Sequence, residues 1–65
     1  MISNSIRFVY NYFVNELKSS GVEDPHIDVL FSIRHVIGID YIVLLGRSYE
    51  VDNDQFQALT RIISL

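Results

Sequence analysis

The amino-acid sequence predicts an all-α protein, a small bundle of four or five helices around a central helix at about residues 25–37. Three observations support this fold class. The central stretch is apolar over more than half of a helical wheel. The segment 4–19 and the stretch after Asp52 also repeat apolar residues at helical spacing. The β-branched run 41–45 has no second strand to pair with, so we expect a short helix there.

The central helix is predicted to begin and end at its own signal residues. Asp24 can cap its first turn, Pro25 suits the first helical position, and Gly38 suits the left-handed residue after its end. The apolar side chains on it are Ile27, Val29, Leu30, Phe31, Ile33 and Ile37. The polar strip, expected to face water, is Asp28, Ser32 and His35. Because so little of this helix is polar, we expect its neighbours to wrap it, and we expect Arg34 to reach solvent or a carboxylate of another helix.

The first helix is predicted over residues 4–19, with Ser3 or Asn4 as its cap and Gly21 in the turn that ends it. Its inward stripe is Ile6, Val9, Tyr10, Phe13 and Leu17. Phe8 and Tyr12 lie one turn apart and off this stripe. They form either a second contact with a neighbouring helix or an exposed aromatic pair for docking.

The last two helices have clear start signals. Asp40 can cap the short helix 41–45, which Gly46 closes. Asp52 and Gln55 have the spacing of a capping box, and Val51 and Phe56 that of a hydrophobic staple. The stripe expected to face inward is Phe56, Leu59, Ile62 and Ile63, with Gln57, Arg61 and Ser64 facing water. No stop signal precedes Leu65, so we expect the natural chain to continue.

Composition narrows the function classes. The 65 residues form one small domain, and the absence of cysteine excludes disulfides and thiolate metal sites. A net charge of −3 disfavours binding to nucleic acid or to an anionic membrane. The longest apolar run is far shorter than the ~20 residues of a membrane span. These features indicate a soluble cytoplasmic protein.

No group of residues predicts catalysis or metal binding. Asp28, Ser32 and His35 share a helix face, but the carboxylate and the imidazole lie about 10 Å apart along the axis, too far for a catalytic triad. His26 and His35 lack the spacing of helical metal ligands. We therefore expect no catalytic, cofactor-binding or metal-binding residue in this segment.

The central stretch resembles the N-terminal domain of the HemK/PrmC family, the release factor glutamine methyltransferases. That family shows the pattern Pro-x-Leu-Asp-Ala-Glu-Leu-Leu-Leu-x-His-Val-Leu-Gly, and residues 25–38 follow it without a gap. The positions that match by residue type are Pro25, Asp28, His35, Val36 and Gly38. Residues 40–45 and the helix start at Val51-Asp52 also resemble the family. Val29, Leu30 and Ser32 depart from the pattern and make one side of the helix more apolar than in the family.

The resemblance implies a specific role. The family uses S-adenosylmethionine to methylate the glutamine of the Gly-Gly-Gln motif in peptide chain release factors. Its methyl-donor site and Asn-Pro-Pro-Tyr motif lie in a following α/β domain, so no catalytic or cofactor residue carries over to this chain. Residues 1–65 would form a monomeric N-terminal domain that helps to position the release factor. The docking candidates, chosen for exposed aromatic or basic character without a clear role in the core, are Phe8, Tyr12, Tyr41, Arg47 and Tyr49. The alternative is a stand-alone helical protein-interaction module that forms a dimer.

Overall fold

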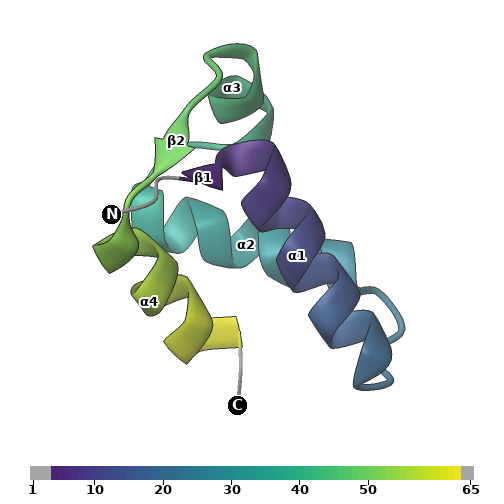
Figure 1. The fold of residues 1–65 in the computed structure, drawn as a ribbon. Coiled ribbons are helices and arrows are strands. Elements are labelled where there is room, and N and C mark those ends of the chain that lie inside the picture. The colour runs from purple at the N-terminus through teal and green to yellow at the C-terminus, as the bar shows by residue number, and fades with distance from the viewer. Residues whose placement is uncertain (1–3, 64–65) are drawn as a thin grey trace.

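The fold is a small all-α bundle, as the sequence predicts. A computed structural model describes residues 4–63, in which four helices contain most of the chain and two short strands pair (Figure 1). The elements in chain order are β1 (Asn4–Ser5), α1 (Ile6–Ser19), α2 (Pro25–Ile37), α3 (Tyr41–Gly46), β2 (Glu50–Val51) and α4 (Asn53–Ile63). The predicted short helix at residues 41–45 is therefore confirmed.

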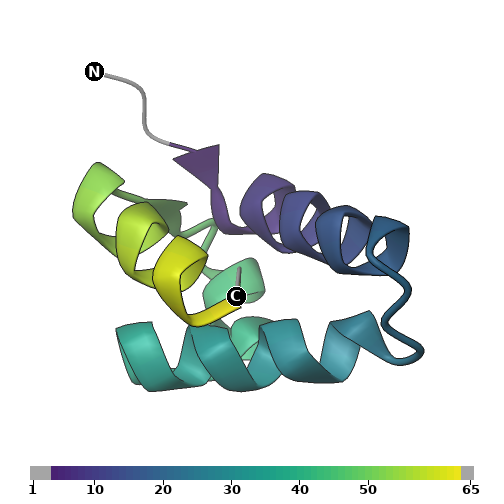
Figure 2. The same cartoon turned by 90° about the horizontal axis from the view of Figure 1, so that it is seen from below.

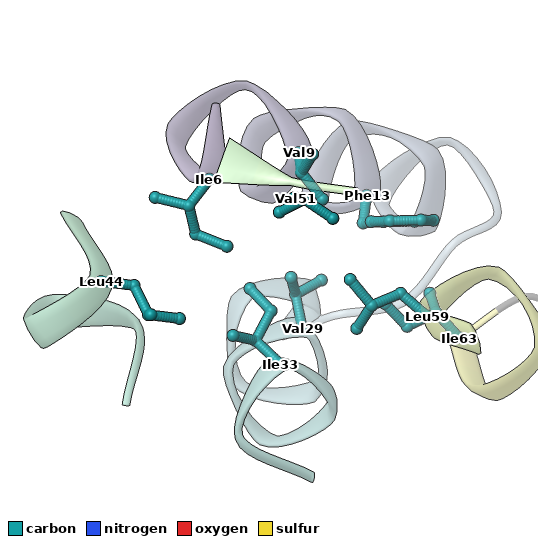
Figure 3. Close-up of a cluster of buried hydrophobic side chains, with 9 residues drawn as sticks. All are labelled: Ile6, Val9, Phe13, Val29, Ile33, Leu44, Val51, Leu59 and Ile63. Carbon is teal, nitrogen blue, oxygen red and sulfur yellow. The ribbon is translucent and has the colours of Figure 1, made fainter. Parts of the chain in front are cut away.

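The core lies between α2 and the elements that pack on one side of it. In Figure 2, α2 runs along one side of the molecule, and α1 and α4 both lie on the other. Helix α2 contacts α1, α3 and α4. The buried side chains, which point toward one another in Figure 3, are Ile6, Val9, Phe13, Val29, Ile33, Leu44, Val51, Leu59 and Ile63. Each helix thus contributes to one continuous apolar cluster.

The prediction that α2 is wrapped by its neighbours is wrong for one of its faces. Val29 and Ile33 are fully buried, whereas Ile27 is 56% exposed and Phe31 is 76% exposed. The reason is geometric: at about 100° per residue, Ile27 and Phe31 lie on the side of α2 opposite to the buried Val29 and Ile33. The predicted polar strip also needs correction, because Ser32 is buried and its hydroxyl donates a 2.8 Å hydrogen bond to the Asp28 carbonyl.

The sequence did not reveal the strand pair. Asn4 pairs with Val51 and Ser5 with Glu50 in an antiparallel register. The pairing shifts the start of α1 from the predicted residue 4 to Ile6, with Ser5 as the cap that accepts a 3.2 Å hydrogen bond from the Phe8 amide. The alternative cap, Ser3, lies outside the described residues. A ladder of two residues per strand is too short to show period-two alternation.

The predicted helix stops are confirmed at both glycines that carry a positive φ. Gly21 has a φ of 91°, and the amide of Val22 donates to the Leu17 carbonyl while that of Gly21 donates to Lys18, both at 3.1 Å. These two bonds form a Schellman motif. Gly38 has a φ of 87° and donates to the Arg34 carbonyl at 2.8 Å.

The acidic caps of α2 and α3 differ from the expectation. Asp24 and Asp40 occupy the capping positions, but neither side chain makes a capping hydrogen bond. Asp40 instead forms a 3.5 Å ion pair with Arg34, and both side chains are largely exposed. The predicted pairing of Arg34 with a carboxylate is therefore confirmed, although the contact is a surface one of small energetic value.

Helix α4 begins as predicted. Asp52 Oδ1 accepts from the Gln55 amide at 2.8 Å, and Gln55 Oε1 accepts from the Asp52 amide at 3.2 Å, which completes the capping box. Leu59 and Ile63 face inward, but Ile62 is 41% exposed, so its predicted place in the inward stripe is wrong. The position predicted for Ser64 lies outside the described residues.

Candidate protein-docking site

The predicted docking pair on α1 is partly exposed and partly packed. Phe8 is 57% exposed and Tyr12 is 41% exposed, and their ring centroids lie 6.5 Å apart. The Tyr12 ring also lies 5.1 Å from that of Phe13 and 5.8 Å from that of Phe56 on α4. Tyr12 therefore makes a second helix contact, while Phe8 has most of its side chain in solvent.

Tyr41, at the start of α3, is held by a ring contact. It is half-buried and stacks on Tyr10 with the centroids 4.2 Å apart. Burial of the hydroxyl and the nearby Tyr10 raise the pKa of Tyr41, and the positive charge of Arg7 opposes this rise. Tyr10 and Tyr12 lie on different flanks of α1, so Tyr41 belongs to a different surface from Phe8 and Tyr12.

Tyr49 and Arg47 flank the connection between α3 and α4. The Tyr49 hydroxyl accepts a 2.6 Å hydrogen bond from Gln55 Nε2, and the Tyr49 carbonyl accepts from the Ile6 amide at 2.9 Å. Tyr49 therefore joins the connection to both α1 and α4. Arg47 is exposed and follows the last turn of α3. The structure does not gather the five predicted docking residues into one site.

The sequence did not predict a groove around the last turn of α4. One hollow, of about 290 Å³, lies between α1 and α4, and another, of about 440 Å³, lies between α2 and α4. Leu17, Val22 and Ile63 line both hollows, which are therefore adjacent, and we call the two together the α4-end groove. The other lining residues are Tyr12, Phe13, Glu16, Ser20, Thr60, Ile27, Asp28, Phe31, Ser32 and Ile62.

The α4-end groove has an apolar surface and already-bonded hydroxyls. Ser32 and Thr60 donate to the carbonyls of Asp28 and Phe56 at 2.8 and 2.9 Å. Ser20 donates to the Glu16 carbonyl at 3.2 Å. Each of these three hydroxyls is engaged by the preceding turn of its own helix, so none of the three is placed against a base that would activate it. The chemistry that this surface offers is binding through apolar contact.

Charge in the groove is of one sign. Glu16 lies on the α1 wall and Asp28 on the α2 wall. None of the described residues that line the groove is a lysine or an arginine. Within residues 4–63 no group of three or more potential metal ligands comes together. The two carboxylates are therefore placed to attract cationic groups of a ligand that fills the space between them.

A second exposed apolar patch lies on α3. It consists of Ile42, Val43 and Leu45, of which Ile42 is 79% exposed. Only Leu44 of this helix is fully buried.

A helical wheel contained the signal for the α4-end groove. Ile27 and Phe31 are four residues apart and lie on the side of α2 opposite to Val29 and Ile33 at about 100° per residue. A helix with two apolar faces needs either two layers of neighbours or a partner. A chain of this length supplies only one layer.

Comparisons with protein-family models, with curated proteins and with solved structures give no match to this chain. In the part of the chain that the structure describes, every helix is too short or too polar to cross a membrane.

Proposed function

We propose that residues 1–65 form the N-terminal substrate-recognition domain of a HemK/PrmC-type release factor glutamine methyltransferase. The observation that supports this most is the agreement between the family-like pattern and one structural element. The pattern begins at Pro25, the first residue of α2, and ends at Gly38, the left-handed residue that terminates α2. The residues that give the resemblance therefore also set the limits of the helix.

Two further elements support the same proposal. The residues after Gly38 that resemble the family's short third helix form α3. The segment that resembles the family's next helix start contains the capping box of Asp52 and Gln55. The likeness therefore extends across the connections as well as the central helix, which makes a chance match of one apolar helix a weaker explanation.

The resemblance to the family implies which domain of the parent protein has which role. We assign S-adenosylmethionine binding and methyl transfer to a separate catalytic domain of that protein. The helical domain contributes binding of the protein substrate, the release factor, and acts as a monomer in the cytoplasm. Its role is to hold the factor so that the glutamine of the Gly-Gly-Gln motif reaches the other domain, which is catalysis by positioning.

Removal of the domain from the parent enzyme tests the proposal. We expect kcat/KM for the intact release factor to fall at least about tenfold, because remote contacts with the substrate are lost. Methylation of a short peptide that contains Gly-Gly-Gln is expected to change little, since this peptide cannot reach the helical domain. Equal losses for both substrates would contradict a role in recognition.

The predicted docking pair is tested by a narrower substitution. Phe8→Ala/Tyr12→Ala in the full enzyme is expected to weaken binding of the release factor, measured by titration calorimetry. The matched control is Asn11→Ala/Asn15→Ala, which changes two exposed polar residues of the same helix. If the two double variants bind with the affinity of the unchanged enzyme, Phe8 and Tyr12 are not part of the docking surface.

A second candidate function is a stand-alone helical interaction module that dimerises. The exposed side chains of Ile27, Phe31 and Ile62 favour it, because a second copy would cover them. Sedimentation of the 65-residue chain at micromolar concentration separates the two functions. A folded monomer over that range excludes the dimeric module, whereas a dimer at the lowest concentration excludes the monomeric domain.

A further inference from the structure

The α4-end groove is a recess between three helices. Its walls are the second half of α1, the first half of α2 and the last turn of α4. Exposed apolar side chains stand along it, of which Phe31 and Ile27 are the most exposed. The groove thus lies where a further segment would pack against α2, whose outer face is largely exposed.

The walls of the groove favour a helix over an extended peptide. An extended peptide gains most of its affinity by adding a strand to a free sheet edge. Of the strand pair, β2 directly precedes α4, about 15 Å along that helix from the groove at its end. Apart from the first turn of α2 and the last turn of α4, the backbone donors and acceptors of the helical walls are used within the helices, so the groove recognises mainly side chains. A helix presents apolar side chains at i, i+3, i+4 and i+7 along one line, which suits such a groove.

The charged side chains around the groove determine which residues are favoured on the flanks of a bound helix. Glu16 and Asp28 face it from opposite walls, and the exposed Glu23 and Asp24 lie in the turn between those walls. Three cationic side chains lie near these carboxylates without lining the groove. Lys18 lies about 200° from Glu16 around α1. Arg61 is exposed in the last turn of α4, and Arg34, which pairs with Asp40, lines two other hollows together with Phe31. A ligand with lysine or arginine beside its apolar face would therefore meet the carboxylates of the α1 and α2 walls, where no described cation lines the groove.

The same charges disfavour a second copy of this chain as the occupant. Each copy has a net charge of −3, and a two-fold contact over the groove would bring both sets of carboxylates together. They also disfavour nucleic acid and anionic lipid, whose phosphates would be repelled. Among the macromolecules that fit an apolar recess, a cationic amphipathic helix of a protein is the one that the rim attracts.

We propose that the α4-end groove binds an amphipathic helix of a protein partner, with apolar residues between Phe31 and Tyr12 and basic residues against Glu16 and Asp28. This inference rests on the proposed function for the identity of the partner, a release factor. Of the predicted docking residues, the proposed surface contains Tyr12. It does not contain Tyr41, Arg47 or Tyr49.

The first experiment maps binding on the isotope-labelled 65-residue chain by NMR. One probe is the release factor of the same organism. The other is a synthetic helical peptide with leucine at i, i+3, i+4 and i+7 and lysine on its flanks, and its matched control has glutamate in place of lysine. We expect both the factor and the lysine peptide to shift the amides of Leu17, Val22, Phe31 and Ile62. The glutamate peptide is expected to bind at least about tenfold more weakly.

Substitutions then test the two parts of the recognition. Ile62→Ser is expected to weaken the lysine peptide at least about tenfold, because it removes an apolar wall of the groove. Its control, Ile42→Ser, changes an equally apolar and more exposed residue on α3. Glu16→Gln/Asp28→Asn is expected to weaken the peptide about threefold to tenfold and to reduce its salt dependence. The control for charge is Asp54→Asn, in the first turn of α4.

The outcomes separate this inference from the proposed function. Factor binding with shifts confined to Phe8 or to α3 keeps the function and overturns the groove. Binding of the lysine peptide in the groove without factor binding keeps the groove and overturns the function. No binding of either probe at millimolar concentration overturns both. Shifts at the groove that depend on protein concentration alone overturn the inference in favour of self-association. Equal affinity for the lysine peptide and the glutamate peptide overturns the proposed role of Glu16 and Asp28 in recognition.

Discussion

The two faces of α2 carry similar side chains in opposite surroundings. Val29 and Ile33 have no exposed surface, while Ile27 and Phe31 have more than half of theirs in solvent. All four belong to one helix of thirteen residues and lie within two turns of one another. The inner face packs against the other helices, and the outer face only borders a hollow that it shares with residues of α1 and α4.

This difference shows that the apolar character of a side chain does not by itself determine whether the side chain is buried in the core. Burial of apolar surface contributes about 25 cal/mol per Å², and the inner face already gains it when the chain folds. The outer face gains it only when something else covers Ile27 and Phe31. The inner face therefore determines whether the domain folds, and we propose that the outer face takes part in binding.

The largest expected effect is on the inner face. Ile33→Ala is expected to lower the free energy of unfolding by about 2–5 kcal/mol, because it leaves a cavity in the apolar core. A domain of this size has a margin of about 3–5 kcal/mol, so much of this variant will be unfolded. Urea denaturation followed by circular dichroism measures the loss. Phe31→Ala on the outer face is the control and is expected to change the same quantity by less than about 0.5 kcal/mol.

The next effect belongs to the outer face and appears in binding. Phe31→Ser is expected to weaken the complex with the release factor at least about tenfold while the urea midpoint stays unchanged, because an exposed aromatic ring adds area only to an interface. Titration calorimetry and denaturation of the same sample measure both quantities. If the urea midpoint falls instead, Phe31 is part of the core and the contrast between the faces disappears.

A smaller effect is expected at Ser32, which lies at the boundary between the faces. Its buried hydroxyl bonds to the Asp28 carbonyl of its own helix. Ser32→Ala loses that bond and gains helix propensity, so we expect a change below about 0.5 kcal/mol in the free energy of unfolding. Val29→Ala, three residues earlier and fully buried, should cost clearly more. Equal losses for the two variants would place Ser32 in the core.

The smallest effect lies outside α2 and concerns pH. The raised pKa of Tyr41 means that the folded state favours the neutral phenol more than the unfolded state does. The contribution of the neutral Tyr41 phenol to folding stability is fully present below the ordinary pKa of 10.0. It is lost as the pH rises from there through the higher pKa of Tyr41 in the folded state. Wild-type protein should therefore lose more stability above pH 10.0 than Tyr41→Phe does. Identical melting curves for the two proteins between pH 9 and 11 would contradict the prediction.

The sequence predicted the limits of the helices better than the exposure and the contacts of their side chains. The helix limits at Pro25, Gly38 and Asp52 were predictable, because capping and left-handed glycines are local properties of the chain. The exposure of Phe31 and Ile62 was not, since it depends on which neighbours a short chain can supply. The ladder between Asn4 and Val51 was also missed, because each strand is too short to leave a pattern.

For the docking candidates, too, the sequence did not show which contacts the side chains make in the fold. Tyr41 and Tyr49 were chosen for their aromatic and exposed character, yet each makes a specific internal contact, with Tyr10 and with Gln55. Phe8 was correctly predicted to be off the inward stripe. The α4-end groove was missed because Leu17, Val22 and Ile63 come from three separate segments and meet only in the folded chain.

The pairing of β1 with β2 has a consequence for the order in which the chain folds. The ladder joins positions on either side of α1, α2 and α3, so its closure costs entropy that local helix contacts do not repay. The hairpin of α1 and α2 needs only a short turn and can form early. We expect the ladder and the docking of α4 to come last and to limit the rate. Shorter connections between the helices should then speed folding more than stronger helices would.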